Sequence, residues 1–169
     1  CNSCDQMIFE KDLNKNFNIC TTCNFHMPLY PKERMKFLLD ENTFEQIDYS
    51  TENQDILGFK DLKKYSDRLK DSKKKTEQDD CILLVKGKIE SFPVVIAAFD
   101  FRFMGGSMGR SVGNAFITGA SIAVDQKCAF ITIPSSGGAR MQEGIISLMQ
   151  MPRTIAALQT IEDAKLPHI

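Results

Sequence analysis

The chain has 169 residues, of which 43% are hydrophobic and 25% are charged, and its formal net charge is −1 at pH 7. This length suits one domain with a small appendage, and the composition is typical of globular proteins. The near-zero charge argues against a general nucleic-acid binder, and we find neither a visible signal peptide nor an apolar stretch long enough to span a membrane.

The N-terminal segment, residues 1–27, contains two cysteine pairs with two residues between the members of each pair. Cys1 and Cys4 form the first pair, and Cys20 and Cys23 form the second after a spacer of fifteen residues. Such pairs suit a tetrahedral Zn²⁺ site better than disulfides, because each short turn brings two thiolates to one metal. We therefore expect a zinc ribbon with one structural Zn²⁺ per chain, and a redox dithiol is the alternative.

The charges of this segment argue against nucleic-acid binding by the ribbon. Residues 1–27 contain two basic residues, Lys11 and Lys15, and three acidic residues, Asp5, Glu10 and Asp12. Four thiolates on one Zn²⁺ add a net charge of about −2. Neutralising phosphates requires the opposite sign, so we expect a structural role for the ribbon.

The next segment, residues 28–80, is predicted to be a helical linker region. Pro31 begins a short helix, because proline suits the first helical position and apolar residues follow at helical spacing. Residues 41–59 are polar and irregular, which indicates a linker or a surface segment.

A second helix is expected over residues 60–75, with Leu62, Tyr65 and Leu69 on one stripe. This range contains eight Lys or Arg residues and three Asp residues, which is an excess of five positive charges. A solvated helix face is the simpler interpretation. The alternative is a patch that meets an anionic substrate, such as a nucleotide-like phosphate group.

The remaining segment, residues 81–169, alternates strands and helices and therefore predicts an α/β fold. Two β-rich runs that begin at Cys81 are joined by a tight connection at Ser91 and Phe92, which predicts a hairpin. The glycine-rich loop "FRFMGGSMG" follows, and "CAFITIP" over residues 128–134 reads as a buried strand. "LPHI" at the end of the chain begins a further strand.

Two helices are expected in this segment. The first covers residues 108–127, where Gly109, Gly113 and Gly119 would be destabilising unless they allow close packing. Its apolar face consists of Val112, Phe116, Ala120 and Ala123. The second covers residues 140–163, with a kink expected at Pro152. Its apolar stripe consists of Ile145, Leu148, Met149, Pro152, Ile155 and Ala156.

Two glycine-rich loops are the candidate chemical site. "FMGGSMG" is neither a Walker loop nor a dinucleotide fingerprint, and "SSGGAR" lacks the pattern that would make Ser135 or Ser136 a nucleophile. Backbone N–H groups at Gly137 and Gly138, ahead of a helix, are suited to bind a developing oxyanion. The alternative is a turn that needs glycine only for a positive φ.

The cysteine quartet, "DFRFMGGSMG" (100–109) and "SSGGARMQEGIISLMQM" (135–151) together resemble the carboxyltransferase β subunits of bacterial-type multisubunit acetyl-CoA carboxylases. The resemblance covers nearly the whole chain, including "YSDRLKDSKKKTEQDD" (65–80). "GGARMQEG" is specific to acyl-CoA carboxyltransferases, and the zinc ribbon separates this subunit from propionyl-CoA-type relatives. The resemblance implies an α/β, crotonase/ClpP-like fold built from ββα units, which is incomplete here and carries the ribbon.

The resemblance also implies an activity. The family transfers CO₂ from carboxybiotin on a carrier protein to acetyl-CoA, which forms malonyl-CoA in the first committed step of fatty acid biosynthesis. Loss of CO₂ leaves a biotin anion that can take the substrate proton, so no side-chain base is required. Gly137 and Gly138 then supply backbone oxyanion donors. The substrate-binding residues implied are Gly105, Gly106, Ser107 and Arg140.

The family implies partners as well. These are a carboxyltransferase α subunit in an α2β2 heterotetramer, the biotin carboxyl carrier protein and biotin carboxylase. The implied cofactors are Zn²⁺ and a biotin that is not attached to this chain. We expect no membrane or nucleic-acid partner, and a location in the bacterial cytoplasm, with the plastid stroma as the alternative.

The family's β subunit continues beyond Ile169 with another glycine-rich turn. The sequence begins with Cys1 rather than with a Met. The resemblance therefore implies a chain truncated at its C-terminus, and it leaves open whether this chain is active alone. The alternative function is a non-catalytic zinc-ribbon module that serves interaction or nucleic-acid-binding regulation.

Overall fold

A computed structural model of the chain describes residues 1–51 and 55–169. The chain divides into two units, Cys1–Leu38 and Leu39–Ile169. No helix in the described part combines the length and the apolar character that crossing a membrane requires.

The smaller unit contains two short helices, α1 (Glu10–Lys15) and α2 (Pro31–Leu38). Both cysteine pairs lie on turns rather than in these helices. Pro31 is the first residue of α2, which confirms the predicted start of this helix. Within the unit, the rings of Phe17 and Phe37 meet edge to face with their centroids 5.0 Å apart.

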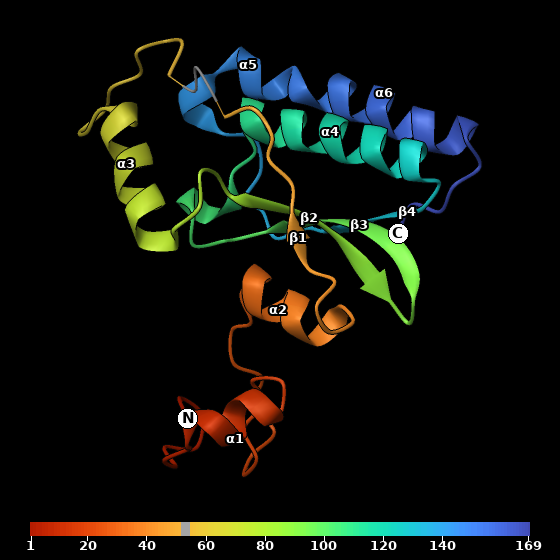
Figure 1. Ribbon diagram of the computed structural model, residues 1–169. Coiled ribbons are helices and arrows are strands. Elements are labelled where there is room, and N and C mark those ends of the chain that lie inside the picture. Colours follow the sequence, from red (N-terminus) through yellow and green to blue (C-terminus); the bar gives the residue numbers. More distant parts are fainter. Residues whose placement is uncertain (52–54) are drawn as a thin grey trace. The chain divides into compact units, whose positions relative to one another are not determined.

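The larger unit is built on a mixed four-stranded sheet (Figure 1). Its strands lie in the order β1 (Glu45–Gln46), β2 (Ile82–Ile89), β3 (Phe92–Phe99) and β4 (Ala129–Ile133). The first two pairings are antiparallel, and β3 pairs with β4 in parallel through a helical crossover. The predicted hairpin is confirmed as β2 and β3.

The turn of this hairpin differs slightly from the prediction. Its two central residues are Glu90 and Ser91, rather than Ser91 and Phe92. Both have a positive φ, 49° and 71°, which is the backbone that a tight two-residue hairpin turn requires. Phe92 is therefore the first residue of β3.

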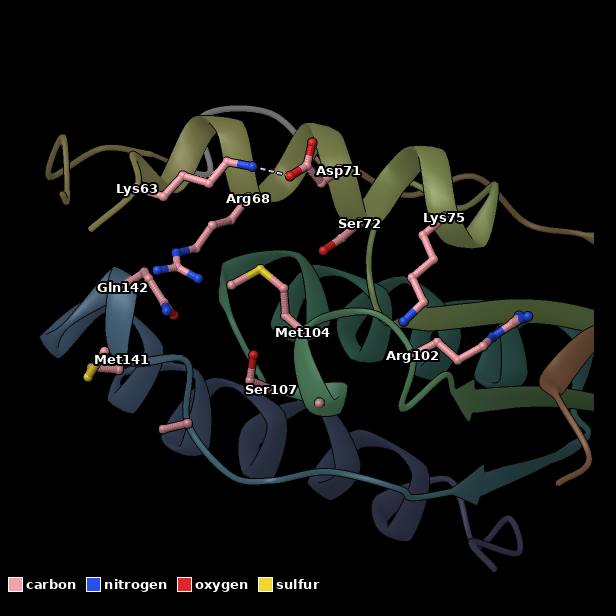
Figure 2. A pocket seen from close by; sticks show the side chains of 12 residues that line it. Lys63, Arg68, Asp71, Ser72, Lys75, Arg102, Met104, Ser107, Met141 and Gln142 are labelled. Carbon is pink, nitrogen blue, oxygen red and sulfur yellow. Dashed lines mark hydrogen bonds and ion pairs between the residues drawn. The ribbon is translucent and has the colours of Figure 1, made fainter. Parts of the chain in front are cut away.

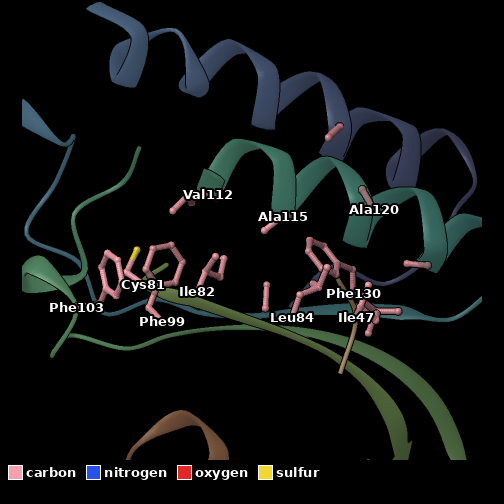
Figure 3. Packing of buried hydrophobic residues seen from close by; sticks show 14 of the residues in the cluster. Ile47, Cys81, Ile82, Leu84, Phe99, Phe103, Val112, Ala115, Ala120 and Phe130 are labelled. Carbon is pink, nitrogen blue, oxygen red and sulfur yellow. The ribbon is translucent and has the colours of Figure 1, made fainter. Parts of the chain in front are cut away.

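Helix α4 (Arg110–Gln126) covers the sheet, and α6 (Gln150–Asp163) packs on the other side of α4. Figure 3 shows Val112, Ala115 and Ala120 of α4 above the apolar side chains of the strands. A Cβ atom at Gly119 would lie 2.7 Å from Phe130 Cε2, so glycine is needed for this close approach. The predicted reason for the glycines of this helix is thus confirmed at Gly119.

Helix α3 (Tyr65–Thr76) begins later than the sequence predicted. Lys64 has an extended backbone, with φ −62° and ψ 142°, so the helix cannot continue through it towards the N-terminus. Tyr65 and Leu69 are buried as expected. Leu62 is fully exposed before the helix, so its predicted place on the apolar stripe is wrong.

The final helix is divided, which corrects the prediction of one helix kinked at Pro152. It consists of η2 (Met141–Glu143), α5 (Ile145–Leu148) and α6. Gly144, with φ 52° and ψ −133°, interrupts the first part. Pro152 lies in the first turn of α6, where a backbone N–H has no helical partner to lose.

The expected apolar stripe of this region is largely exposed. Ile145 and Ile155 are 64% and 67% exposed, and Leu148 and Met149 are also exposed. The buried positions are Ser147, Gln150, Ala157 and Ile161. The expected final strand is reduced to a single parallel bridge between Phe130 and His168.

Candidate active site and metal centre

The four paired cysteines converge on one point. The Sγ atoms of Cys1 and Cys23 are 3.7 Å apart, and those of Cys4 and Cys20 are 3.8 Å apart. All four sulphur atoms lie within 4.8 Å of one another. In a tetrahedral site with Zn–S bonds of about 2.3 Å, neighbouring sulphur atoms are about 3.8 Å apart, so these residues fit a Zn²⁺ ion.

Backbone N–H groups support thiolates at this centre. The N–H of Ser3 donates to Cys1 Sγ, and the N–H of Thr22 donates to Cys20 Sγ, both at 3.4 Å. The N–H of Cys23 has the largest effect on Cys20 and, together with that of Thr22, lowers the pKa of this thiol to about 7. A thiolate is the form that binds a metal, so the surroundings of Cys20 favour metal binding.

The two glycine-rich loops, which are far apart in the sequence, pair side by side. Gly137 N–H donates to Gly105 O at 2.9 Å, and Met108 N–H donates to Gly138 O at 2.8 Å. A third bond of 2.8 Å runs from Arg140 N–H to Met108 O. Backbone hydrogen bonds therefore join the two loops, and the sequence-predicted residues of both loops meet there.

The contact between the loops requires glycine at position 106. Gly106 has a positive φ of 64°, and a Cβ atom there would lie 2.1 Å from Ser135 O. Gly106 is buried by this contact. Its predicted contact with substrate stays a prediction, whereas its packing against the second loop is evident.

The two candidate oxyanion donors differ in their surroundings. Gly137 N–H is engaged with Gly105 O and holds the loops together. Gly138 N–H donates to the hydroxyl of Ser136 at 3.1 Å, and Ser136 is exposed. The space beside the Gly138 Cα atom is open, and its φ is +110°. Of the two N–H groups, that of Gly138 has the exposed partner and the open surroundings, and its contact with a substrate oxygen stays a prediction.

Arg140, predicted to contact substrate, is fully buried between the loops and the rest of the larger unit. Its guanidinium lies 2.5 Å from an oxygen of the fully buried Asp80, and it also donates to Ser107 O at 2.6 Å. Burial alone would lower the pKa of Arg140, but the Asp80 carboxylate more than offsets this and raises it. A substrate contact of Arg140 stays a prediction, and the observed contacts give it a positioning role.

Glu143 is a second buried charge beside the loops. Its Oε2 atom accepts from the N–H of Arg110, the first residue of α4, at 2.6 Å, so a carboxylate lies at the N-terminus of that helix. Its Oε1 atom accepts from the Tyr65 hydroxyl at 2.7 Å. A Cβ atom at Gly109 would lie 2.3 Å from Glu143, which explains the glycine at this position.

Cys81 lies beside this buried network but is not a nucleophile candidate. Burial raises the pKa of its thiol well above the usual range, so the thiol stays neutral. Its sulphur is 3.4 Å from Ser107 O, to which the thiol donates. Cys81 therefore acts as a small buried residue.

An open pocket of about 600 Å³ lies against the paired loops. Gly105, Ser107 and Ala139 contribute to its wall, and the other side is formed mainly by α3 (Figure 2). Four cationic side chains line it against one acidic side chain, Asp71. The cationic residues are Lys63, Arg68, Lys75 and Arg102.

Several of these cations already have anionic neighbours. Lys63 pairs with Asp71, Arg68 lies 2.6 Å from Asp61, and Arg102 lies 2.6 Å from the buried Asp100. Arg68 Nε is a buried atom without a hydrogen-bond partner. Lys75 is exposed and makes no ion pair among the residues that the structure describes. The pocket thus offers donors that suit a phosphate or carboxylate group.

The sequence did not single out several residues of this site. Asp80 ends a polar run and has no periodic neighbour, and Arg102 looks like one charge among many. Tyr65 was expected only as an apolar stripe residue. Only for Glu143 does the sequence offer a clue to its partner. It follows Arg140 by three residues, and this spacing brings opposite charges together on one helical turn.

Comparison with known proteins gives two family matches. Residues 32–169 match the model of the carboxyl transferase domain, and residues 1–23 match that of the acetyl-CoA carboxylase zinc finger domain. The second match covers all four cysteines of the metal centre, and the first covers both glycine-rich loops.

Two similar proteins are bacterial subunits of the same name. The whole chain is 49% identical to the acetyl-coenzyme A carboxylase carboxyl transferase subunit beta of Granulibacter bethesdensis, of which it covers 55%. It is 47% identical, again over its full length, to the subunit of the same name from Jannaschia sp. (strain CCS1), of which it covers 53%. The chain thus spans about half the length of these relatives.

Among solved structures, a crystal structure of transcarboxylase 12S is similar to 78% of this chain and to 24% of its own chain. The TM-score is 0.58 and the sequence identity is 26%. That structure is described as a hexamer with methylmalonyl-coenzyme A and methylmalonic acid bound. The α/β, crotonase/ClpP-like fold class predicted from the sequence is thus confirmed.

Proposed function

Because the chain belongs to the carboxyl transferase domain family, we propose that it forms part of the carboxyltransferase β subunit of an acetyl-CoA carboxylase. The protein then transfers CO₂ from carboxybiotin to the methyl carbon of acetyl-CoA, which gives malonyl-CoA and supplies fatty acid synthesis. The zinc finger match and the two β-subunit relatives support this choice. The observation that carries it is the accessible Gly138 N–H on the paired loops, beside a cationic pocket.

In this proposal the N–H of Gly138 stabilises the negative charge that forms on the thioester oxygen. Removing a proton from the methyl group of acetyl-CoA moves charge onto that oxygen, and a fixed donor there lowers the barrier. The bond from Gly138 to Ser136 spans two residues and is exposed, so a substrate oxygen can take its place. Carboxybiotin supplies the CO₂ and the base when it is bound.

We assign the phosphate groups of acetyl-CoA to the cationic pocket. Helix α3 has twelve residues, which corresponds to about 18 Å at a rise of about 1.5 Å per residue. Lys63 lies just before its first residue and Lys75 near its end, so cations are spread along the length of the pocket (Figure 2). The opposite wall contains Ser107 and Ala139 beside Gly138. An extended ligand can therefore place its phosphates on the cations and its thioester at the loop.

The exposed apolar face of α5 and α6 is the surface that we assign to a partner subunit. Large apolar side chains that are about half exposed or more gather there, and such patches mark interaction sites. These residues are Ile145, Leu148, Met149, Met151 and Ile155. We propose that a carboxyltransferase α subunit binds this face in an α2β2 assembly, which also receives the biotin carboxyl carrier protein and works with biotin carboxylase.

The proposal retains the other expectations from the sequence. Residues 1–27 form the zinc ribbon, residues 28–80 the helical linker region, and residues 81–169 the N-terminal part of the carboxyltransferase domain. Four cysteine ligands leave no open position on the metal, so the Zn²⁺ is structural rather than catalytic. The protein is expected to work in the bacterial cytoplasm.

Isotope exchange tests the proposed function directly. The full-length protein is combined with its α subunit and a biotin derivative, and the conversion of malonyl-CoA to acetyl-CoA is followed. We expect exchange that depends on the biotin derivative and on both subunits. A folded, zinc-loaded complex without exchange would contradict the proposal and favour the non-catalytic ribbon module.

A further inference from the structure

We propose that Tyr65 is a positioning residue for carboxyl transfer, which acts through Arg140 and Glu143 on the loop that carries Gly138. The catalytic part of this inference rests on the proposed function. The structural part does not, since it concerns how one buried hydroxyl holds the paired glycine loops.

The hydroxyl of Tyr65 joins two opposite charges in the interior. Tyr65 is fully buried, donates to Glu143 Oε1 at 2.7 Å and accepts from Arg140 Nη1 at 3.1 Å. Burial raises the pKa of this phenol, so it stays protonated and able to donate. The direct contact between Arg140 Nη1 and Glu143 Oε1 is longer, at 3.4 Å. The hydroxyl therefore supplies the shorter bonds that fix this ion pair.

Arg140 and Glu143 in turn hold the ends of the glycine loops. The backbone N–H of Arg140 continues the pairing that begins at Gly137 and Gly138. The Arg140 side chain donates from Nε and Nη2 to Ser107 O, at 3.1 and 2.6 Å. Glu143 fastens the same segment to the start of α4. A shift of this pair therefore moves the loop on which Gly138 lies, two residues before Arg140.

The rest of the structure is held independently of the Tyr65 hydroxyl. Arg140 makes two bonds to Asp80, at 2.5 and 3.0 Å, that do not involve the hydroxyl. Leu69 of α3 belongs to the buried apolar core, and Thr76 is buried near the end of this helix. Removing the hydroxyl should therefore leave the fold and the pocket wall in place and loosen the loop.

The test is Tyr65→Phe in the full-length protein assembled with its α subunit. We expect kcat for carboxyl transfer to fall by between about tenfold and 100-fold, because small misplacements of a reacting geometry have effects of this size. The KM for acetyl-CoA should stay within about twofold, since the pocket wall is retained. A purely structural role would lower the unfolding temperature without this selective loss of kcat.

Tyr49→Phe is the matched control. Tyr49 is another tyrosine of the larger unit, and its hydroxyl donates to Ile82 O at 2.6 Å, a strand carbonyl rather than the Arg140–Glu143 pair. Removing it deletes a comparable hydrogen bond. We expect Tyr49→Phe to lower the unfolding temperature while leaving kcat near that of the unmodified protein.

Hydrogen–deuterium exchange provides a readout that needs no activity. We expect faster exchange in residues 131–144 of Tyr65→Phe, and no such change in Tyr49→Phe. If Tyr65→Phe leaves both kcat and this exchange unchanged, or if its loss is confined to KM, the inference is overturned. If the unmodified protein and Tyr49→Phe are both inactive, the proposed function fails, and the exchange result alone decides whether Tyr65 holds the loop.

Discussion

Replacing Arg140 by methionine should destabilise the larger unit strongly. The guanidinium and the Asp80 carboxylate are both fully buried and lie 2.5 Å apart, so the substitution leaves a buried carboxylate without this cation. Removing one partner of a buried ion pair costs about 3–5 kcal/mol. The lost bonds to Ser107 O belong to the same change and should not be added separately.

Denaturant unfolding of the full-length protein measures this effect. The midpoint should fall while the slope stays constant, since the change affects stability rather than the surface exposed on unfolding. Arg68→Met is the control, because Arg68 and Asp61 form a pair whose side chains are about one-third exposed and which is worth about 1 kcal/mol or less.

A double variant separates the buried charge from simple loss of packing. Asp80→Asn removes the carboxylate charge and keeps an oxygen that can accept from the N–H of Cys81. If the buried carboxylate charge dominates, Asp80→Asn combined with Arg140→Met should be less destabilised than the sum of the two single variants by about 0.5–3 kcal/mol. A cost of less than about 1 kcal/mol for Arg140→Met alone would refute the reasoning.

Four further outcomes follow from the site. The Cys20→Ser, Cys23→Ser double variant should lose the one Zn²⁺ per chain found by metal analysis, whereas Cys128→Ser should retain it, because only the first removes proposed ligands. Lys75→Gln should raise the KM for acetyl-CoA about fivefold in steady-state kinetics, and Lys70→Gln on the same helix should not, since Lys70 does not line the pocket. Ser136→Ala should keep substantial exchange activity, because its hydroxyl is only a replaceable acceptor; a trapped acyl-serine would show the opposite. Ile155→Asp should weaken binding of the α subunit in sedimentation, whereas Gln159→Asp should not, and equal binding by both variants would argue for another interface.

Local patterns were sufficient for much of the fold. The hairpin of β2 and β3 and the helix α4 follow from short-range alternation and helical spacing, so their residues carried the necessary signal. The cysteine pairs likewise predicted the metal centre, because the turn that joins each pair determines how its two sulphur atoms meet.

Long-range contacts explain what the sequence did not reveal. Asp80 and Arg140 are sixty positions apart, and no periodicity links a buried arginine to its carboxylate partner. The sequence places an apolar stripe along α5 and α6, and Ile145 and Ile155 of this stripe are exposed. A hydrophobic face indicates that something covers it, but the pattern does not tell whether the covering surface belongs to the same chain.

The pairing of the glycine loops also changes how the central claim should be tested. Gly138 has a φ of +110°, whereas a proline ring holds φ near about −65°, so Gly138→Pro would disturb the loop as well as remove the donor. Replacing the residue by glycolic acid, which turns the amide of Gly138 into an ester, removes the N–H and keeps the flexible backbone.

The decisive measurement is therefore the kcat of carboxyl transfer by the full-length complex that carries the ester at position 138. If Gly138 N–H binds the developing oxyanion, kcat should fall by about 10²–10³. The KM for acetyl-CoA should change far less, because the bond strengthens as the charge develops. A folded ester variant whose kcat stays within about threefold of the unmodified complex would contradict this account of the site.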